Sequence, residues 1–331
     1  MTKQTAVVDL DAHKYAIAFA AEKRSVEVTH KTTKEVWSVA NRSEWYGRGK
    51  TKDAGILAQI NALRDSPYSW DEFEYVDIQK PEPLANILHT AKVNVERVVK
   101  ASGASKADYF IGKGESFRVG RSTLLKYKGA REASIKPIML GEVSEYLIKR
   151  FSAEVITDIE VDDKITMECW LKPDKFVILE DKDGYGSGVK IYNFNKPEEG
   201  IINTNCFGKL WRDSKGKVRG VGRMFKLWQV CSNDTIDHYK ANCFSDVKWG
   251  DVSAYEALVN SQNDIELMTN ALQVFQKLYP EPKVVTGWRG DEIEIDALYV
   301  FQEMMDMAHM HRWEDDWVNV REVLDKMRIK Y

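Results

Sequence analysis

Cysteine is scarce in this chain of 331 residues, and the few cysteines show no metal-binding spacing. No two are separated as in a CxxC pair, which excludes a zinc knuckle and predicts reduced thiols in a cytoplasmic protein. The four are Cys169, Cys206, Cys231 and Cys243.

Long apolar runs and a surplus of one charge are also missing. No run approaches the roughly 18 apolar residues of a membrane span, and the polar segment Met1–Thr5 lacks the apolar region of a signal peptide. We therefore expect no membrane partner. Charged residues make up 30% of the chain, yet the net charge is only -3. This balance argues against a polybasic tail or a wholly basic nucleic-acid binder, but it leaves room for local segregation of charge.

The apolar content and its periodicity predict the fold class. Hydrophobic residues make up 44% of the chain, enough for one large domain or two smaller ones. Short apolar segments alternate with segments of helical periodicity, which predicts an α/β fold with a central, mostly parallel, twisted sheet flanked by helices. The expected strands are 6–10, 109–112, 154–157 and 176–179, and the expected helices are 15–22, 84–101, 138–151 and 162–171.

The remaining segments are less regular. Residues 24–83 show strand character near Val26–Thr29 but are mostly irregular, and we interpret them as an elaboration of the core. Residues 209–213 and 217–225 predict a basic hairpin with a glycine turn. From Phe225 onward the chain is predicted to be mostly helical.

Acidic residues recur in four short groups. Three groups follow strand ends or open the helix after one, and in an open parallel sheet ligands gather outside the carboxyl ends of the strands. In the fourth, Asp234 and Asp237 are three residues apart, so on a helical turn both carboxylates would face one side. The groups are Asp9–Asp11, Glu160–Asp163, Asp181–Asp183 and Asp234–Asp237.

Converging carboxylates need a counter-charge, and the usual one is a hard cation such as Mg²⁺, which prefers oxygen ligands. Two such ions form a clamp for in-line attack on a phosphodiester. The acidic groups therefore point to a metal-dependent nuclease.

A basic stretch separates the first two acidic groups. Between residues 113 and 136 the only acids are Glu115 and Glu132. Alone, such a stretch is more typical of an exposed helix face, but its place between acidic groups favours a nucleic-acid clamp. Its basic residues are Lys113, Arg118, Arg121, Lys126, Lys128, Arg131 and Lys136.

These segments occur in the order of a known family. The chain resembles the flap-endonuclease and 5′-to-3′ exonuclease family within the PIN-like nucleases, most closely its bacteriophage branch. The resemblance covers residues 5–20 and about 108–260. It rests on Val7–Asp11, Phe117–Arg118 with Lys126–Arg131, Glu160–Asp163, Ile178–Asp183 and Asn233–Asp237, and on Trp249–Ala254, which is similar to a helix-turn-helix variant that grips duplex DNA.

The sequence departs from the family pattern at the second strand. That strand usually ends in a metal-facing aspartate, but Tyr109–Gly112 carries no acid; Asp108 precedes this segment and Glu115 follows it. In addition, Asn233 stands where a glycine is usual, His238 follows Asp237, and residues 24–83 are longer than a minimal member needs.

The resemblance implies two Mg²⁺ ions, with Mn²⁺ as an alternative, on a shared bed of carboxylates. One ion would be served mainly by Asp9, Glu160 and Asp162. The other would be served mainly by Asp183, Asp234 and Asp237, with Asp181 between the two ions and Asp163 acting through water.

The basic residues would contact nucleic acid. Lys128 and Arg131 are the expected electrostatic stabilisers at the scissile phosphate, assisted by Lys113 and Arg118. Binding of the DNA backbone is expected from Arg121, Lys126, Lys128, Arg131, Trp249 and Gly250.

The expected organisation has two parts. Residues 1–202 would form the PIN-like catalytic region, with 24–83 as the elaboration and a basic arch within 113–150. Residues 203–331 would form a basic hairpin and a helical DNA-binding region. The expected partners are DNA with 5′ ends or flaps and RNA–DNA hybrids, with a replication protein bound through 24–83.

Two alternatives to the 5′-nuclease remain at this level. The missing aspartate favours a structure-specific DNA-binding relative with little or no catalysis. A PIN-type ribonuclease is the other, although the long C-terminal region argues against it. His309 and His311 are two residues apart and would not share a helix face, so no metal is expected there.

Overall fold

The computed structural model describes residues 4–48, 54–132 and 134–331, which fall into two compact units. The first unit comprises residues 1–13, 93–135 and 147–331, and the second comprises 14–92 and 136–146. The boundary expected at residue 203 lies inside the first unit. Three helices contribute residues to both units: α1 (Leu10–Ala20), α4 (Leu84–Ala101) and α6 (Leu140–Phe151).

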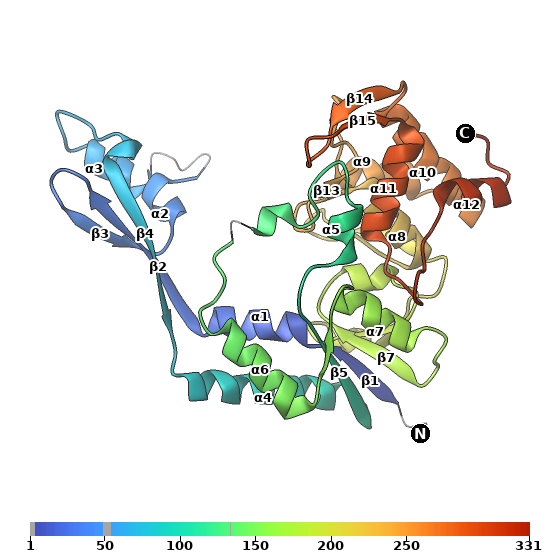
Figure 1. Ribbon diagram of the computed structural model, residues 1–331, viewed down its shortest axis with the longest axis horizontal. Coiled ribbons are helices and arrows are strands. Elements are labelled where there is room, and N and C mark those ends of the chain that lie inside the picture. The colour runs from blue at the N-terminus through green and yellow to red at the C-terminus, as the bar shows by residue number, and fades with distance from the viewer. Residues whose placement is uncertain (1–3, 49–53, 133) are drawn as a thin grey trace. The chain divides into compact units, whose positions relative to one another are not determined.

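The first unit is built on a six-stranded sheet, part of which is labelled in Figure 1. Its spatial order is β6-β5-β1-β7-β8-β9, with β9 antiparallel and all other neighbours parallel. This confirms the predicted α/β class and the mostly parallel sheet flanked by helices. The strands are β1 (Thr5–Asp9), β5 (Lys106–Gly112), β6 (Glu154–Ile156), β7 (Lys175–Leu179), β8 (Lys190–Asn193) and β9 (Ile201–Asn203).

The central strands are apolar because they are covered on both faces. Val7 and Val8 of β1 and Phe176 and Ile178 of β7 are fully buried, as expected for the interior of a parallel sheet. β5 and β7 pair with opposite sides of β1. The strand order therefore reverses at β1, and the carboxyl ends of these three strands open a crevice of the kind in which α/β proteins bind ligands.

Helix α7 (Val161–Cys169) contacts β1, β5 and β7, so it covers one face of the sheet. The predicted helix at 15–22 instead begins at Leu10, directly after β1. The early start has a local cause, because the Asp9 carboxylate accepts a hydrogen bond from the Asp11 backbone amide at 2.6 Å and satisfies a donor of the first turn.

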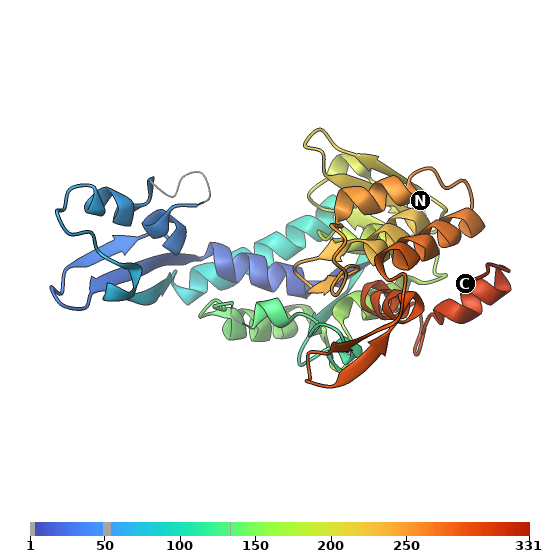
Figure 2. The same cartoon turned by 90° about the horizontal axis from the view of Figure 1, so that it is seen from above.

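The chain from Phe225 onward was predicted to be mostly helical, but fewer than half of these residues are in helices, and turns and two short hairpins separate them. Helix α8 contacts α9, α10 and α11 around buried Phe225, Phe275 and Phe301, and these yellow-to-red helices lie together in both views (Figures 1 and 2). The helices are α8 (Gly222–Cys231), α9 (Asp251–Leu258), α10 (Asp264–Leu278), α11 (Ala297–Ala308) and α12 (Val320–Lys326).

Three short hairpins accompany these helices. The predicted basic hairpin is present as β10 (Lys209–Arg212) and β11 (Val218–Val221), shorter than expected because α8 already begins at Gly222. The others are β12 (Asn233–Asp234) with β13 (Tyr239–Lys240), and β14 (Lys283–Thr286) with β15 (Glu292–Ile295).

The second unit contains an antiparallel sheet of order β3-β2-β4, where an irregular elaboration was predicted. Helices α2 (Arg42–Tyr46) and α3 (Ile56–Asn61) lie on one side of it (Figures 1 and 2). Its core is aromatic: Trp45 and Phe73 are buried with ring centroids 5.1 Å apart. The strands are β2 (Glu22–His30), β3 (Val36–Val39) and β4 (Phe73–Pro81).

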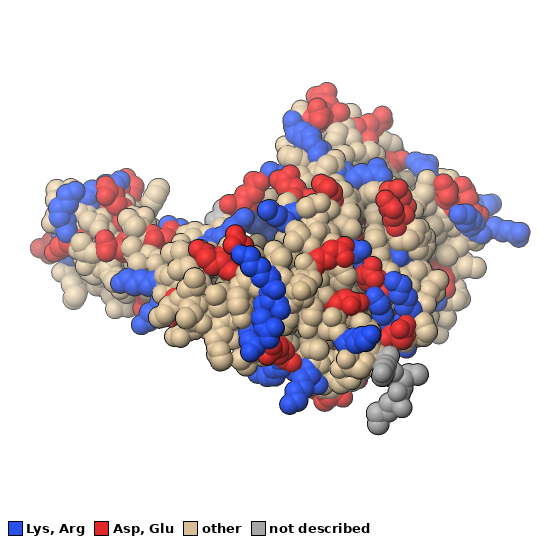
Figure 3. Space-filling model, turned by 60° about the horizontal axis from the view of Figure 1, so that its bottom comes forward, with Lys and Arg blue, Asp and Glu red and all other residues tan. Residues whose placement is uncertain are grey.

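No helix in the described part of the chain combines the length and apolar character needed to cross a membrane. On the face shown in Figure 3, basic and acidic side chains are interspersed rather than gathered into one patch.

Candidate active site

Carboxylates from three segments meet at the carboxyl edge of the sheet. Asp9 is the last residue of β1, and Asp181 follows β7. Glu160 caps α7 and Asp162 lies in its first turn, where a negative charge is favoured by the helix dipole. The parallel strands and the helix that follows β6 thus bring together residues far apart in the sequence.

Asp162 lies at the centre of this group. Burial raises the pKa of Asp162 well above its ordinary value, and the nearby charges of Asp9, Glu160 and Asp181 raise it further. Such an elevation means that these carboxylates cannot all be ionised together unless a cation compensates them. All four were predicted to belong to one site, and the structure places them together.

Asp183 extends the group toward α8. Burial and the Asp181 charge raise the pKa of Asp183 to about 7. Its carboxylate accepts a hydrogen bond from Gln229 Nε2 at 2.6 Å and pairs with Lys182 Nζ at 2.9 Å. Lys182 Nζ also reaches Asp234 Oδ2 at 3.1 Å and so joins two acidic segments.

The expectation of a helical turn for Asp234 and Asp237 is corrected by the structure. Both lie in the β12–β13 hairpin, because the Asp234 carboxylate accepts the backbone amides of Ile236 and Asp237 at 2.8 and 2.9 Å. Such side-chain-to-backbone bonds compete with a helix and favour a turn. The two carboxylates still reach the site: Lys182 binds Asp234, and Arg131 binds Asp237 at 2.7 Å.

Lys128 and Arg131 lie among the carboxylates, as predicted. Lys128 Nζ pairs with Glu160, and its backbone amide donates to the Asp237 carbonyl at 2.9 Å. Lys128 has a φ of 56°, a left-handed conformation that is unfavourable for a lysine and that persists only where the surroundings hold it. The buried Tyr127 hydroxyl lies 3.1 Å from a Glu160 oxygen and 3.3 Å from an Asp237 oxygen and can donate its one hydrogen to either, which places the basic segment against both acidic ones.

Arg118 and Asp163, by contrast, form a buried ion pair beside the group. Two Arg118 nitrogens contact the Asp163 carboxylate at 2.6 and 2.9 Å, and a third bond reaches Glu160 at 3.1 Å. Burial acts to raise the pKa of Asp163, but the Arg118 charge and the hydrogen bonds from Arg118 and His311 lower it overall. Both carboxylate oxygens of Asp163 accept hydrogen bonds from Arg118, so Asp163 neutralises the buried guanidinium in this structure.

The C-terminal helical part holds the basic segment in place. Arg118 donates to the His309 carbonyl at 2.5 Å. The Glu303 carboxylate accepts the backbone amides of Thr123 and Leu124 at 3.0 and 2.8 Å, and Arg289 donates to the carbonyl of Ser122 at 2.7 Å. Residues 118–124 are therefore fixed by groups that lie 167 to 191 positions further along the chain.

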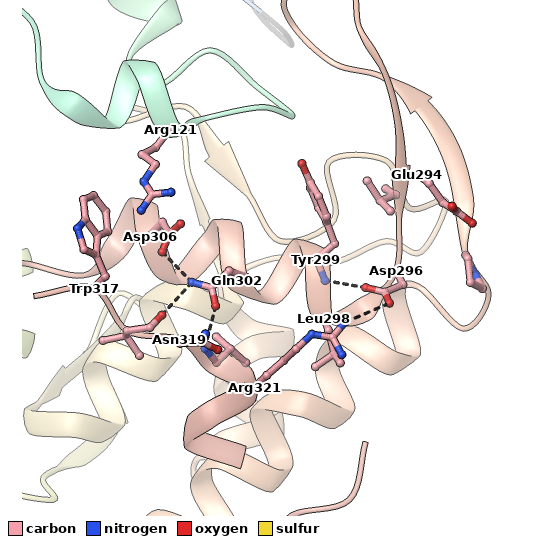
Figure 4. A pocket seen from close by; sticks show the side chains of 14 residues that line it. Arg121, Glu294, Asp296, Leu298, Tyr299, Gln302, Asp306, Trp317, Asn319 and Arg321 are labelled. Atoms are coloured by element: carbon pink, nitrogen blue, oxygen red, sulfur yellow. Dashed lines mark hydrogen bonds and ion pairs between the residues drawn. The ribbon is translucent and has the colours of Figure 1, made fainter. Parts of the chain in front are cut away.

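The other expected nucleic-acid contacts are spread more widely. The Arg121 guanidinium lies 4.1 Å from the centroid of the Trp317 ring, in a pocket next to Gln302 and Asp306 (Figure 4). Lys126 pairs with Glu132. Lys113 is exposed and its backbone amide donates to the Ile156 carbonyl.

The segment Trp249–Ala254, which resembles a duplex-binding helix-turn-helix variant, runs into helix α9. Helices α9 and α10 are joined by a short turn, and Gly250 caps α9 with open space where a side chain would lie. Trp249, however, directs its indole N–H to the Cys231 carbonyl at 2.8 Å. It therefore secures this segment to α8.

Asp11 belongs to the first acidic group of the sequence but was not predicted to be a metal ligand, and the structure adds it to the site. Its Oδ1 accepts a hydrogen bond from the Gly112 amide at 2.9 Å, so its carboxylate lies at the end of β5. A Cβ on Gly112 would stand only 2.6 Å from Asp11 Oδ2. The carboxylate of Asp11 thus lies at the carboxyl end of β5, where the resemblance led us to expect an aspartate from the strand itself. The usable signal was its position two residues after Asp9.

Replacing Gly112 by alanine is expected to push Asp11 from this place. Metal-dependent activity should fall about tenfold to a hundredfold, as for Asp11→Asn, while the free energy of unfolding should change by about 1 kcal/mol or less. Initial rates and urea denaturation measure the two effects. Gly141→Ala is the matched control, since its Cβ meets nothing within 4 Å. Equal activity of Gly112→Ala and Gly141→Ala would mean that Asp11 is not part of the site.

The donor set suits a hard divalent cation. The seven predicted carboxylates other than Asp163 are all oxygen donors, and the cations that pair with them include Lys128 and Arg118 on Glu160, Lys182 on Asp183 and Asp234, and Arg131 on Asp237. Within residues 4–48, 54–132 and 134–331, no three His, Cys, Asp or Glu side chains converge on one point as metal ligands do. Lysines instead bridge the acidic segments, with Lys128 on Glu160 and Lys182 on both Asp183 and Asp234. An excess of buried acid with raised pKa values is the condition that Mg²⁺ relieves.

Comparison with models of known protein families, with characterised proteins and with solved structures finds no match to this chain.

Proposed function

We propose that this protein is a metal-dependent 5′-nuclease with a PIN-like fold, which hydrolyses phosphodiester bonds at DNA 5′ ends or flaps. One observation carries the proposal: carboxylates from β1, α7, the β7 end and the β12–β13 hairpin gather at the switch point of the sheet, beside Lys128 and Arg131. Oxygen donors with cationic phosphate ligands are the parts that phosphodiester hydrolysis requires.

In this proposal the carboxylates would hold two Mg²⁺ ions. Asp9, Glu160 and Asp162 would hold one, and Asp183, Asp234 and Asp237 the other, with Asp181 between them and Asp11 at the β5 end. When bound, the ions supply a nucleophilic hydroxide near neutral pH and stabilise the attacking and leaving oxygens. Asp163 holds Arg118 and has no ligand role.

The chain's own cations then orient the phosphate. In the absence of metal, Lys128 and Arg131 neutralise Glu160 and Asp237. Cations on those carboxylates would take over that role and leave the lysine and arginine available to the scissile phosphate, where arginine suits bidentate contact. Tyr127 contributes by keeping this segment against the acidic residues.

The direct test is cleavage of a 5′-flap duplex in Mg²⁺, with 5′- and 3′-labelled strands run in parallel. Loss of label from the 5′ side only supports the proposal, and product length distinguishes stepwise trimming from flap removal. A matched RNA flap tests the ribonuclease alternative, which predicts the reverse preference. Cleavage that EDTA does not stop would contradict the proposal.

The pKa of Asp183 gives an independent prediction about the metal. The pKa of Asp183 in the folded protein is raised to about 7. Ionisation of this side chain therefore lowers the free energy of unfolding of wild type as pH rises from about 4 to 7. In EDTA, the free energy of unfolding of Asp183→Asn should therefore increase by about 2 kcal/mol relative to that of wild type between pH 5 and pH 7.5. Buried histidines with lowered pKa values, such as His309, make the free energy of unfolding rise with pH instead, but they do so equally in wild type and variant.

Urea denaturation at the two pH values measures this difference, and Mg²⁺ should reverse its sign at pH 7.5. Wild type then gains binding energy through Asp183 that the variant lacks. A difference that is unaffected by Mg²⁺ would mean that Asp183 holds no cation.

The structure also offers an observation in favour of the second candidate, a DNA-binding relative with little catalysis. Lysines already neutralise two acidic segments, and β5 carries no carboxylate at its carboxyl end, because its acid, Asp108, lies near its start and pairs with Lys175 at 2.9 Å. Tight, metal-independent binding of the flap without cleavage would favour that function.

A further inference from the structure

A second cavity in the first unit lies apart from the carboxylates and has a different character. Its volume is about 280 Å³. Helices α8, α10 and α12 and the segment Gly186–Gly188 form its walls, and its lining is mostly apolar. The apolar lining includes Trp170, Leu227, Leu267, Met268, Met305 and Met327. Methionine is flexible and polarisable, so such a cavity adapts to aromatic and branched ligands.

One side chain in this lining is a cation without a counter-ion. Lys226 Nζ contacts His309 Nδ1 at 2.5 Å, and within the described part of the chain no carboxylate forms an ion pair with it. The nearby Asp316 is already engaged by His309 Nε2 at 3.0 Å and by Arg312 at 2.7 Å. Among the other cations in the lining, Arg223 has a bidentate partner in Asp264.

The contacts of His309 fix the direction of the Lys226 bond. Asp316 can only accept, so His309 Nε2 carries the hydrogen and Nδ1 accepts from Lys226. An ammonium has three donors, and His309 takes one. Burial and then the charge of Arg312 lower the pKa of Lys226 to about 7, as expected for an amine that lacks an anion. An arriving carboxylate would supply that anion.

We propose that this cavity binds a small organic monocarboxylate with an aromatic or branched aliphatic body, its carboxylate on Lys226 and its body among the methionines and Trp170. A charge-assisted hydrogen bond in an apolar site gives such a ligand both affinity and orientation. A neutral analogue would leave the amine without its anion, and a phosphate or dicarboxylate would bring excess charge into an apolar space.

The cavity shares two elements with the carboxylate group. Gly186 ends the turn that begins at Asp183, and Gln229, which donates to Asp183, lies one helical turn beyond Lys226 on α8. A Cβ on Gly186 would stand 2.8 Å from Gln229 Oε1, so the packing here is close. The binding proposal does not depend on nuclease activity.

The test is ¹⁹F NMR of 3-[4-(trifluoromethyl)phenyl]propionate with the full chain, without metal or DNA. The matching alcohol, 3-[4-(trifluoromethyl)phenyl]propan-1-ol, serves as the neutral probe. We expect the acid to bind at least about tenfold more tightly than the alcohol, in line with a hydrogen bond to a charged group. Lys226→Met, which keeps the side-chain volume, should abolish that preference.

Two further variants keep the test decisive. Lys190→Met removes a half-buried lysine that does not line the cavity and whose amine bonds to the Pro173 carbonyl, and it should bind the acid like wild type. Met327→Trp should fill the cavity and weaken binding of both probes with Lys226 intact, which covers the case that Lys226→Met does not fold. Equal binding of acid and alcohol to wild type, no binding of either, or unchanged binding by Met327→Trp would overturn the proposal.

Discussion

Exchanging both Asp181 and Asp183 for asparagine is expected to lower Mg²⁺-dependent cleavage of a 5′-flap DNA by about a thousandfold or more. Asp181 lies between the two halves of the carboxylate group and Asp183 belongs to the second half, and the charge of Asp181 raises the pKa of both Asp162 and Asp183. Losing both charges should remove about 4 kcal/mol or more of transition-state stabilisation. Single-turnover rates measure the effect directly.

A charge-matched control separates this effect from a change in net charge. The double variant Asp291→Asn, Asp325→Asn removes two exposed carboxylates outside the site and should cleave like wild type. The fold of the Asp181, Asp183 variant is checked by its unfolding in EDTA, where neutralising a crowded acidic group should not destabilise it. Cleavage within tenfold of wild type would refute the nuclease proposal for this site.

The second large effect is expected on stability. Replacing Arg118 by methionine should lower the free energy of unfolding by about 3–5 kcal/mol, because it leaves the Asp163 carboxylate buried without its partner. Asp163→Leu should cost a comparable amount, because it leaves the Arg118 guanidinium buried without its partner. Urea denaturation in EDTA gives both values in the absence of any metal contribution.

A double-mutant cycle then identifies the role of Asp163. Arg118→Met combined with Asp163→Leu should be less destabilised than the sum of the single changes, since removing both charges leaves neither unpaired. A metal ligand would behave differently: without metal, its neutralisation would cost little and would not couple to Arg118. Additive effects in the cycle would instead mean that Asp163 acts as a metal ligand.

Local patterns predicted the elements of the first unit well. The helix at 84–101 matches α4, because Ile87, Ala91 and Val95 recur at helical spacing and are all buried. The strand at 176–179 needed only its run of apolar residues. The gathering of the acidic groups also followed from local evidence, because strands of a parallel sheet share one carboxyl edge.

What the sequence could not reveal depends on contacts between distant segments. Asp162 and Asp163 are neighbours of one type, but successive side chains on a helix diverge by about 100°. Only Arg118, 45 positions away, decides that Asp163 faces the interior. The sheet of the second unit was missed for a similar reason, since β2 pairs with β4 across about 40 residues of irregular sequence. Asp11 was missed because its neighbour Gly112 is distant in sequence.

The fixing of residues 118–124 by the C-terminal part has a consequence for synthesis. Arg118 depends on the His309 carbonyl, and Thr123 and Leu124 on Glu303, all of which are translated after every carboxylate of the site. While the chain is still growing on the ribosome, the acidic residues exist but the segment that carries Lys128 and Arg131 lacks these anchors. The proposed nuclease would therefore be inert as a nascent polypeptide and would become competent only after residues 303–316 have emerged, which would keep unfinished chains from cutting nucleic acid near the site of their own synthesis.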